Sequence, residues 1–455
     1  MSSKPVWVWL PGEAEPTRAG TFTLGGTAVS PVGTFEYDPG YVENNHRISL
    51  DQRQLLRFKG AAKATDYQGL FDVFRDARPE GFGMDWLQRR RDVDSLSDLE
   101  ALEFCAGDAV GAVQVCEDIA AKAAFHPTPS QDMFDVVRDL DVVQTHEPMS
   151  TRLRDLLSTG LGGERPKFTV MHKGQWWIAK FAGPKDDPTS PLREYLCMKL
   201  ASLVGIDAAE VEWVQQSGRA AVLIRRFDRL VDANGRCLRH HFASAATVLG
   251  AAAASRDAPG RTYVALALQA GRWGVQGHLP ELWRRMAFNV LVGNGDDHPR
   301  NHGFLRTDKG WRLSPAYDIA PYTPHRGKVL DVKSLSMGVL RNGEAGATAD
   351  NLLVAAKQFG LDYGIANDFL DHAYQMIHDS WDRLAQEAGA EAIAPPAVDF
   401  HANLTHRGCG RKLGLLEGSS CIPTKTESEP LSSTSSSANA PARPSVSWVT
   451  QPRMH

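Results

Sequence analysis

The chain has 455 residues, of which 42% are hydrophobic and 23% are charged, and its formal net charge is −4. This composition is ordinary for a globular protein, and the length suggests about three domains or lobes. The slight negative charge argues against a polycation that wraps nucleic acid unaided. No window approaches the roughly 18 apolar residues of a membrane span, and the first residues lack a secretory signal. We therefore expect a cytoplasmic protein without a membrane partner.

The cysteines are widely spaced and include no C-x-x-C pair. A chain of this length can bury a core without disulfides, so we expect reduced thiols and no zinc site. The six cysteines are Cys105, Cys116, Cys197, Cys237, Cys409 and Cys421.

The first part of the chain is expected to form short strands and then helices. Residues 5–50 alternate short apolar runs with Gly and Pro, which indicates strands joined by turns. Residues 71–91 predict two helices joined by a turn, and the arginines at 89–91 fit a solvated helix face better than a nucleic-acid patch. Residues 117–150 are punctuated by prolines and are expected to connect two lobes.

The next part has the element order of a kinase small lobe. Residues 168–181 predict a hairpin, residues 193–205 a helix that ends at Gly205, and residues 220–227 a buried strand. Strand, strand, helix, strand is the order found in the small lobe of protein kinases.

Helices dominate from about residue 245 onward. The clearest are 279–293 and 364–388, where apolar residues recur at helical spacing. Residues 425–448 are rich in Ser, Pro and Thr and hold almost no large apolar side chain, so this stretch is expected to be disordered.

The most informative segment is NVLVGNGDDHPRNHGF, residues 289–304. It begins as the apolar end of a helix and becomes a polar loop. Asp296 and Asn301 are five positions apart, which is the spacing of the catalytic Asp and the Mg²⁺-binding Asn in protein kinases. One irregular loop can thus present a base for a hydroxyl proton and a metal ligand to one cavity, with His298 between them. The alternatives are a solvated turn and a bare Asp/His metal site without ATP.

A second metal ligand is predicted downstream. Asp318 follows Asn301 by 17 residues and comes just after a short strand at 311–313. An Asp in this place holds Mg²⁺ between phosphates in the kinase template. Mg²⁺ suits such a site because it takes few protein oxygens and keeps waters and substrate oxygens.

Upstream, the segment STGLGGERPKF (158–168) is a Gly-rich loop that enters a strand. Gly162 and Gly163 would let backbone amides approach phosphate oxygens, and Arg165 and Lys167 add positive charge. A plain flexible turn is the alternative, because the loop lacks the Gly-Lys-Ser/Thr ending of a Walker A motif.

Lys180 ends the following strand and fits a phosphate-binding lysine, although strand ends also carry ordinary exposed lysines. Glu194 opens the next helix and is its natural ion-pair partner. Arg226 and Asp228 would border an adenine cleft.

Together these segments resemble the HipA family of bacterial serine/threonine kinase toxins. The motifs that carry the resemblance stand in HipA order, and the resemblance covers roughly residues 5–390. They are VWVWLPGEAEP, FRDARPEGFG, GGERPK, IAKF, REYLCMKLA, LIRRFDR, GNGDDHPRNHGF and AYDIAP.

The resemblance implies ATP and Mg²⁺ as cofactors. Asp296 would be the catalytic base, and Asn301 and Asp318 would hold Mg²⁺. Lys180 would bind the ATP phosphates. Gly162, Gly163 and Lys167 would belong to the phosphate loop.

The resemblance also implies partners. These kinases phosphorylate Ser or Thr of a cytosolic protein, in some members an aminoacyl-tRNA synthetase. Many are neutralised by a small helix-turn-helix antitoxin of the HipB type, and operator DNA is bound mainly through that antitoxin.

Autophosphorylation of a loop serine silences some members. That position falls on Gly160 here, so silencing would have moved to Ser158 or Thr159.

The resemblance implies an α+β, bilobal, protein-kinase-like fold. We expect a β-rich N-terminal domain at 1–148, a mixed ATP-binding lobe at 149–245 and an all-helical catalytic lobe at 246–394. A disordered tail at 395–455 would follow. Two other functions stay open: a co-repressor bound to the antitoxin, with catalysis secondary or lost, and a small-molecule phosphotransferase.

Overall fold

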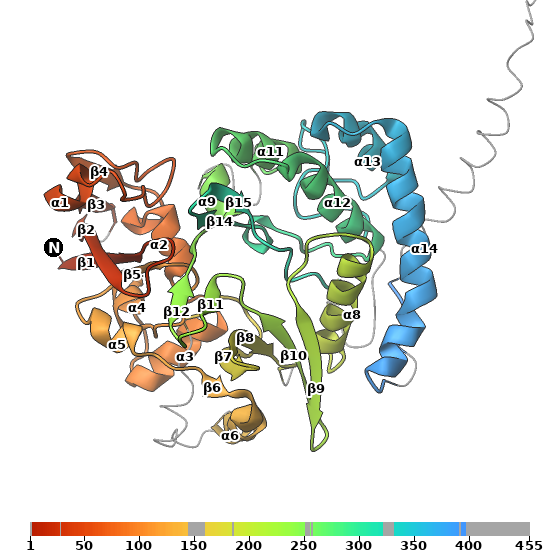
Figure 1. Ribbon diagram of the computed structural model, residues 1–455, viewed down its shortest axis with the longest axis horizontal. Coiled ribbons are helices and arrows are strands. Elements are labelled where there is room, and N and C mark those ends of the chain that lie inside the picture. Colours follow the sequence, from red (N-terminus) through yellow and green to blue (C-terminus); the bar gives the residue numbers. More distant parts are fainter. Residues whose placement is uncertain are drawn as a thin grey trace, which may run out of the picture. The chain divides into compact units, whose positions relative to one another are not determined.

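The computed structural model describes residues 2–27, 29–143, 160–183, 186–250, 255, 258–321, 332–390 and 393–396 (Figure 1). Ser158, Thr159 and nearly all of the predicted tail lie outside these residues. Within them the chain forms two five-stranded sheets, one three-stranded sheet and one two-stranded ladder, together with helices. The fold class is therefore α+β.

The N-terminal domain is built on an antiparallel sheet in the order β4-β3-β2-β1-β5. Aromatic rings of Phe22, Phe35, Phe71 and Phe74 meet edge to face beneath it, a favoured arrangement that joins the helices to the strands. The predicted strands and the pair of helices are confirmed. The elements are β1 (Ser2–Trp9), β2 (Pro16–Gly26), β3 (Pro31–Tyr37), α1 (Pro39–Glu43), β4 (Ala61–Ala64), η1 (Tyr67–Gly69), α2 (Asp72–Ala77), α3 (Phe82–Arg91), α4 (Asp98–Phe104) and β5 (Val113–Val115).

Tyr37 ties the segment after α1 to this sheet. Its buried hydroxyl donates to the Leu55 carbonyl oxygen at 2.6 Å and accepts from the Leu50 amide at 2.9 Å. Replacing Tyr37 by Phe leaves both backbone groups without this partner, so we expect the free energy of unfolding to fall by about 1–3 kcal/mol. Urea denaturation measures the change, with Tyr363→Phe at an exposed position as the control. An unchanged midpoint would contradict the prediction.

The central sheet has the order β6-β7-β8-β10-β9, and only β6 runs parallel to its neighbour. The predicted hairpin is confirmed. Lys173 and Gly174 have φ values of 49° and 72°, as the tight turn between β7 and β8 requires. The strands are β6 (Thr128–Pro129), β7 (Lys167–His172), β8 (Gln175–Lys180), β9 (Val211–Gln216) and β10 (Arg219–Arg225).

The prediction of a connector at 117–150 is wrong over 119–143. This stretch holds α5 (Ile119–Ala123), β6, η2 (Ser130–Asp132) and α6 (Met133–Val143). Met133, Phe134 and Val137 pack in the same core as Phe168 and Trp177 of the central sheet. Burial of these apolar side chains stabilises α6 against the central sheet, so α6 belongs with that sheet.

The remaining part is mainly helical, and α12 packs against α11, α13 and α14. Its helices confirm the two predicted at 279–293 and 364–388. None of the helices in the described ranges is both long and apolar enough to cross a membrane. The helices are α8 (Ser190–Leu203), α9 (Ala245–Leu249), α11 (Tyr263–Arg272), α12 (His278–Leu291), η3 (Pro299–Asn301), α13 (Ala349–Ala356), η4 (Lys357–Phe359) and α14 (Tyr363–Glu387).

The expectation of an all-helical lobe from 246 is wrong. The hairpin of β14 (Gly303–Thr307) and β15 (Gly310–Leu313) pairs with β13 (His241–Ser244) in an antiparallel sheet. Apolar side chains of this sheet pack in the core of the helical part. The polar loop at 294–302 leads directly into β14. A separate ladder joins β11 (Arg229–Val231) and β12 (Cys237–Arg239).

Candidate active site

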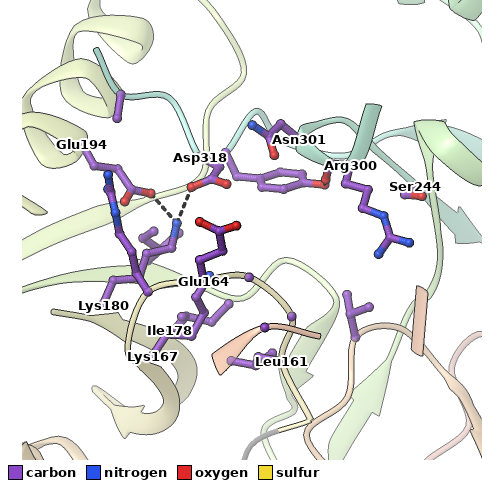
Figure 2. Close-up of a pocket in the computed structure, with 18 of the residues that line it drawn as sticks. Leu161, Glu164, Lys167, Ile178, Lys180, Glu194, Ser244, Arg300, Asn301 and Asp318 are labelled. Carbon is purple, nitrogen blue, oxygen red and sulfur yellow. Dashed lines mark hydrogen bonds and ion pairs between the residues drawn. The ribbon is translucent and has the colours of Figure 1, made fainter. Parts of the chain in front are cut away.

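A cavity of about 740 Å³ is lined by the N-terminal domain, the central sheet and the loops around β14 and β15. Its volume lies in the range of small-molecule sites, about 300–1,000 Å³. Lys180 Nζ lies 2.6 Å from Glu194 Oε1 and 2.6 Å from Asp318 Oδ1 (Figure 2). β8 carries the lysine, the beginning of α8 the glutamate, and the segment after β15 the aspartate. The predicted Lys180–Glu194 ion pair is present, and Asp318, predicted separately as a metal ligand, joins it in one cluster.

Two members of the cluster, Lys180 and Asp318, stabilise each other's charged forms. Burial alone would lower the pKa of Lys180, but Asp318 and Glu194 outweigh it and raise that pKa above its usual range. Burial alone would likewise raise the pKa of Asp318, yet Lys180 and then Lys167 hold it well below its usual range. Lys180 thus stays an ammonium and Asp318 a carboxylate, as binding of phosphates and of a metal requires.

Asp318 owes its position to an unusual backbone conformation. Its φ is +60°, in the left-handed region that few residues other than Gly adopt and that Asp tolerates better than most. The preceding Tyr317 donates its hydroxyl hydrogen bond to the Arg300 carbonyl oxygen at 2.7 Å. The segment after β15 is thereby tied to the loop that carries Asp296.

The predicted catalytic loop, residues 294–302, contains two adjacent aspartates in different environments. Asp297 is 2% exposed, and its carboxylate binds the Tyr263 hydroxyl and His302 Nε2, the latter at 2.8 Å. Asp296 is exposed and lines the cavity. Partial burial raises its pKa, and Asp318 and Glu164 raise it further against the opposing effect of His298. Asp296, and not Asp297, is therefore the accessible carboxylate that could accept a proton.

Asn301 and His298 also face the cavity, as predicted. The Asn301 side chain is largely buried, and its amide nitrogen donates to the Asp296 carbonyl oxygen at 3.5 Å. Its amide oxygen is the atom left to act as a ligand. The Nδ1 atom of His298 is buried without a hydrogen-bond partner in the described structure. A bound group could supply that partner.

The phosphate loop, residues 160–167, lines the cavity with Gly162, Gly163, Arg165 and Lys167. Gly163 has φ +106°, and a Cβ atom there would lie 2.3 Å from Lys167 Nζ. The positive φ favours Gly at this position, and a side chain there would have to displace the flexible end of Lys167. Lys167 and Lys180 place two ammonium groups beside the cavity.

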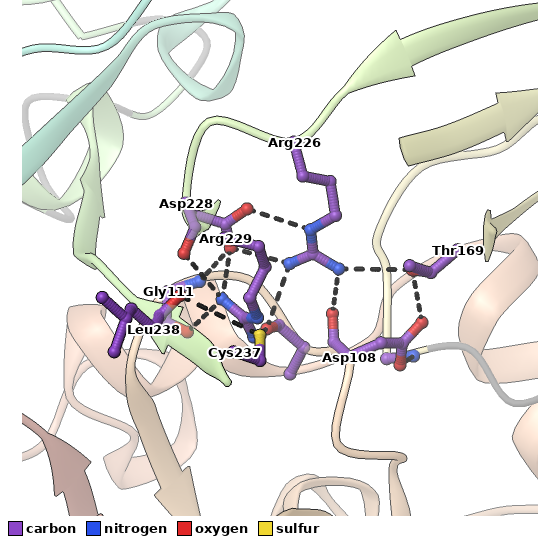
Figure 3. A network of polar contacts seen from close by, with 10 residues as sticks. Asp108, Gly111, Thr169, Arg226, Asp228, Arg229, Cys237 and Leu238 are labelled. Carbon is purple, nitrogen blue, oxygen red and sulfur yellow. Dashed lines mark hydrogen bonds and ion pairs between the residues drawn. The ribbon is translucent and has the colours of Figure 1, made fainter. Parts of the chain in front are cut away.

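Arg226 and Asp228 line the cavity, as expected for the border of an adenine cleft, but the Arg226 guanidinium is bound by protein groups. This guanidinium is fully buried and donates to both Asp228 carboxylate oxygens at 2.9 and 2.7 Å and to the Asp108 carbonyl oxygen at 2.6 Å (Figure 3). Arg229 Nη1 lies 2.7 Å from Asp228 Oδ2, which also accepts from Arg226 Nη2. These partners occupy the guanidinium, so its geometry supports a structural role that joins β10 to the N-terminal domain.

The sequence interpretation missed the contribution of the N-terminal domain. Asp76, near the end of α2, and Glu80, between α2 and α3, line the cavity. Asp76 accepts from the Ser244 hydroxyl and the Thr247 hydroxyl, each at 2.7 Å. Glu80 Oε2 lies 2.6 Å from Arg300 Nη1. The FRDARPEGFG motif spans this segment and was the signal that could have located it.

The donor set fits Mg²⁺. Within the described residues no group of three or more His, Cys, Asp or Glu side chains could hold a metal by itself. Asp318 and Asn301 instead offer hard oxygens beside a cavity with room for phosphates and water. Mg²⁺ in phosphate-transfer sites is held in this way, by one or two side chains plus substrate oxygens.

Residues 8–116 match the family model described as the HipA N-terminal domain, and residues 159–381 match the model described as the HipA-like C-terminal domain. The chain belongs to the HipA family. The two matched ranges contain most of the N-terminal sheet, the loop at 160–167 and the loop at 294–302.

Relatives agree with this assignment. The chain is 26% identical to the candidate kinase Y4mE of Sinorhizobium fredii, over 50% of this chain and 58% of Y4mE. It is 23% identical to the serine/threonine-protein kinase toxin HipA of Shewanella oneidensis, over 53% of this chain and 60% of that protein. The match thus spans less than two thirds of the length of either relative.

A solved structure shares the fold. It is a chain of the Shewanella oneidensis complex of HipA, HipB and operator DNA, which superposes with a TM-score of 0.61 at 19% identity. The superposition covers 90% of this chain and 97% of that chain. The HipA-type fold thus extends over most of the chain.

Proposed function

We propose that the protein is an ATP- and Mg²⁺-dependent serine/threonine protein kinase and the toxin of a toxin–antitoxin pair. The observation that carries the proposal is the position of Lys180 between Glu194 and Asp318, beside a cavity that Asp296 and Asn301 also line. Family membership and the kinase names of the relatives support it.

The residues divide the chemistry among them. Lys180, Lys167 and Arg165 bind and orient the phosphates of ATP. The Asp296 carboxylate accepts the proton of the acceptor hydroxyl as its oxygen bonds to the γ-phosphorus and the bond to the β-phosphate oxygen breaks. Asp318 and Asn301 would hold Mg²⁺, which supplies positive charge to the phosphate oxygens.

The partners follow from the same assignment. The acceptor is a Ser or Thr of a cytoplasmic protein, and a component of the translation machinery is our first candidate. We also propose a small helix-turn-helix antitoxin as a binding partner, with DNA contacted mainly through it. Support comes from the Shewanella complex, in which a fold of this type occurs together with HipB and operator DNA.

The test is phosphate transfer from ATP labelled at the γ-position, with Mg²⁺ and a cell lysate as acceptor. We expect label in a discrete protein band that mass spectrometry can identify. Omission of Mg²⁺ should remove it. Label only in small metabolites would instead favour a small-molecule phosphotransferase, and no nucleotide binding would leave the antitoxin-partner function as the better account.

The affinity for ATP should fall as pH rises. Burial, and then the Lys180 ammonium, lower the pKa of Lys167 to about 8. Lys167 therefore loses its positive charge as pH rises through this value. We expect ATP to bind about three- to tenfold more weakly at about pH 9 than at about pH 7.

Isothermal titration with ATP measures this dependence. The matched variant is Lys167→Arg, whose guanidinium keeps its charge over the whole range, so its affinity should change little with pH. Equal pH dependence in the two proteins would show that Lys167 is not the titrating group.

A further inference from the structure

The N-terminal domain holds the beginning of the phosphate loop. Asp108 lies between α4 and β5 and is fully buried. Its carboxylate accepts hydrogen bonds from the Gly160 backbone amide at 2.6 Å and from the Thr169 hydroxyl at 2.9 Å. One side chain of the N-terminal domain thereby fixes both ends of the segment that runs from the phosphate loop into β7.

Gly160 is held so closely that no side chain fits. A Cβ atom there would lie 2.8 Å from the Ala109 amide nitrogen and 2.9 Å from its Cα atom. Both are backbone atoms, and they cannot move aside without distorting the chain around Ala109. The absence of a side chain at Gly160 is therefore a condition for the observed contact between the loop and the N-terminal domain.

A second contact holds the middle of the loop. The Phe82 amide, at the start of α3, donates to the Gly163 carbonyl oxygen at 2.9 Å. Gly83 also approaches the Leu161 carbonyl oxygen, since a Cβ at 83 would lie 2.1 Å from that oxygen. The start of α3 thus packs directly against the loop backbone.

The same segment reaches the catalytic loop. Glu80 forms its ion pair with Arg300, the residue immediately before Asn301, and Arg300 in turn accepts the Tyr317 hydroxyl through its carbonyl oxygen. One connection therefore runs from Glu80 through Arg300 to the segment that carries Asp318.

We propose that the N-terminal domain is a positioning element of the kinase site, in which Asp108 holds the phosphate loop and Glu80 holds the catalytic loop. This inference rests on the proposed kinase function. Neither residue reaches the reacting atoms: Asp108 acts through Gly160, and Glu80 acts through Arg300. The N-terminal domain thereby orders two loops that line the cavity.

Hydrogen exchange of residues 160–167 tests the first contact without requiring catalysis. Asp108→Ala leaves the Gly160 amide without its acceptor, so exchange across the loop should accelerate about tenfold or more. Asp108→Asn keeps an oxygen that can accept from Gly160 and should restore most of the protection. Where phosphate transfer is measurable, Asp108→Ala should raise KM for ATP by about tenfold and change kcat less.

The matched control is Asp51→Ala. Asp51 is also a buried carboxylate of the N-terminal domain, and it accepts the backbone amides of Arg53 and Gln54 at 2.5 and 2.6 Å without touching the loop. It should destabilise the domain but leave exchange at 160–167 unchanged. If exchange at 160–167 accelerates equally in both variants, Asp108 only stabilises the domain as a whole, and the proposal is overturned.

Gly160→Ala provides an independent test, since the added methyl group should push the loop away from Ala109. We expect faster exchange at 160–167 and a raised KM for ATP, as in Asp108→Ala. Gly364→Ala is the control, because a Cβ there meets nothing within 4 Å. Normal exchange in Gly160→Ala would contradict the contact.

The ion pair between Glu80 and Arg300 calls for a double-mutant cycle on Glu80→Gln and Arg300→Gln. If Glu80 acts through Arg300, each variant should lower kcat about tenfold with little change in KM for ATP, and the double variant should be no worse than either. Additive losses would overturn this part. If no variant and no wild type transfers phosphate, the proposed function fails, and the exchange experiment still decides whether the N-terminal domain orders the loop.

Discussion

Asp296→Asn should abolish phosphate transfer while leaving ATP binding intact. Asp296 is the carboxylate of the catalytic loop that reaches the cavity, and its raised pKa brings it closer to the value that suits a general base. An amide cannot accept the hydroxyl proton. We therefore expect kcat to fall by about 10²–10⁴-fold with the affinity for ATP changed less than about threefold.

Single-turnover transfer and ATP titration measure the two quantities separately. Asp308→Asn, in the turn between β14 and β15, is an exposed aspartate-to-asparagine control that should keep full activity. Asp297→Asn is the informative contrast, because it removes the partner of Tyr263 and His302 and should lower the melting temperature as well. Activity retained in Asp296→Asn would exclude Asp296 as the base.

Asp228→Asn should produce the largest loss of stability. Asp228 is buried and binds Arg226, Arg229 and the Gly111 amide, which joins the end of β10 to the N-terminal domain. The variant removes the negative charge and leaves two buried guanidinium groups without it. We expect the free energy of unfolding to fall by about 3–5 kcal/mol, as measured by urea denaturation.

The pH dependence of unfolding gives the control. Burial alone would raise the pKa of Asp228, but Arg226 and Arg229 outweigh it and hold that pKa well below its usual range. A group with a depressed folded-state pKa stabilises the fold above its unfolded pKa, about 3.9 for Asp, and this contribution is lost as pH falls further. The wild type should show this acid component and Asp228→Asn should lack it. Equal stability of Asp228→Asn and Asp308→Asn would contradict the prediction.

Local patterns in the sequence were sufficient for most elements and for several of the side chains that meet in the cavity. The hairpin at Lys173 and Gly174, the helix that ends at Gly205 and the loop after α12 all depend on residues close together in the chain. Turn, cap and periodicity signals are local, so they can be interpreted from one sequence. The spacing of Asp296 and Asn301 likewise places both residues in one loop.

Other predictions failed because they depended on partners far away in sequence. Residues 119–143 look like a connector until Met133 and Phe134 are seen to pack against Phe168. The hairpin of β14 and β15 becomes a sheet only because β13, more than fifty residues earlier, supplies the third strand.

The sequence by itself determined that the chain carries a strand-borne Lys, an Asp, an Asn and a second Asp, in that order, which is the pattern behind the resemblance to HipA kinases. The spacing to Asn301 had already singled out Asp296, and only the tertiary structure showed that its neighbour Asp297 is buried beside Tyr263. The tertiary structure also placed Arg226 in a structural network. The N-terminal domain entered the site in the same way, because whether a carboxylate such as Asp108 holds a loop 52 residues away depends on three-dimensional proximity.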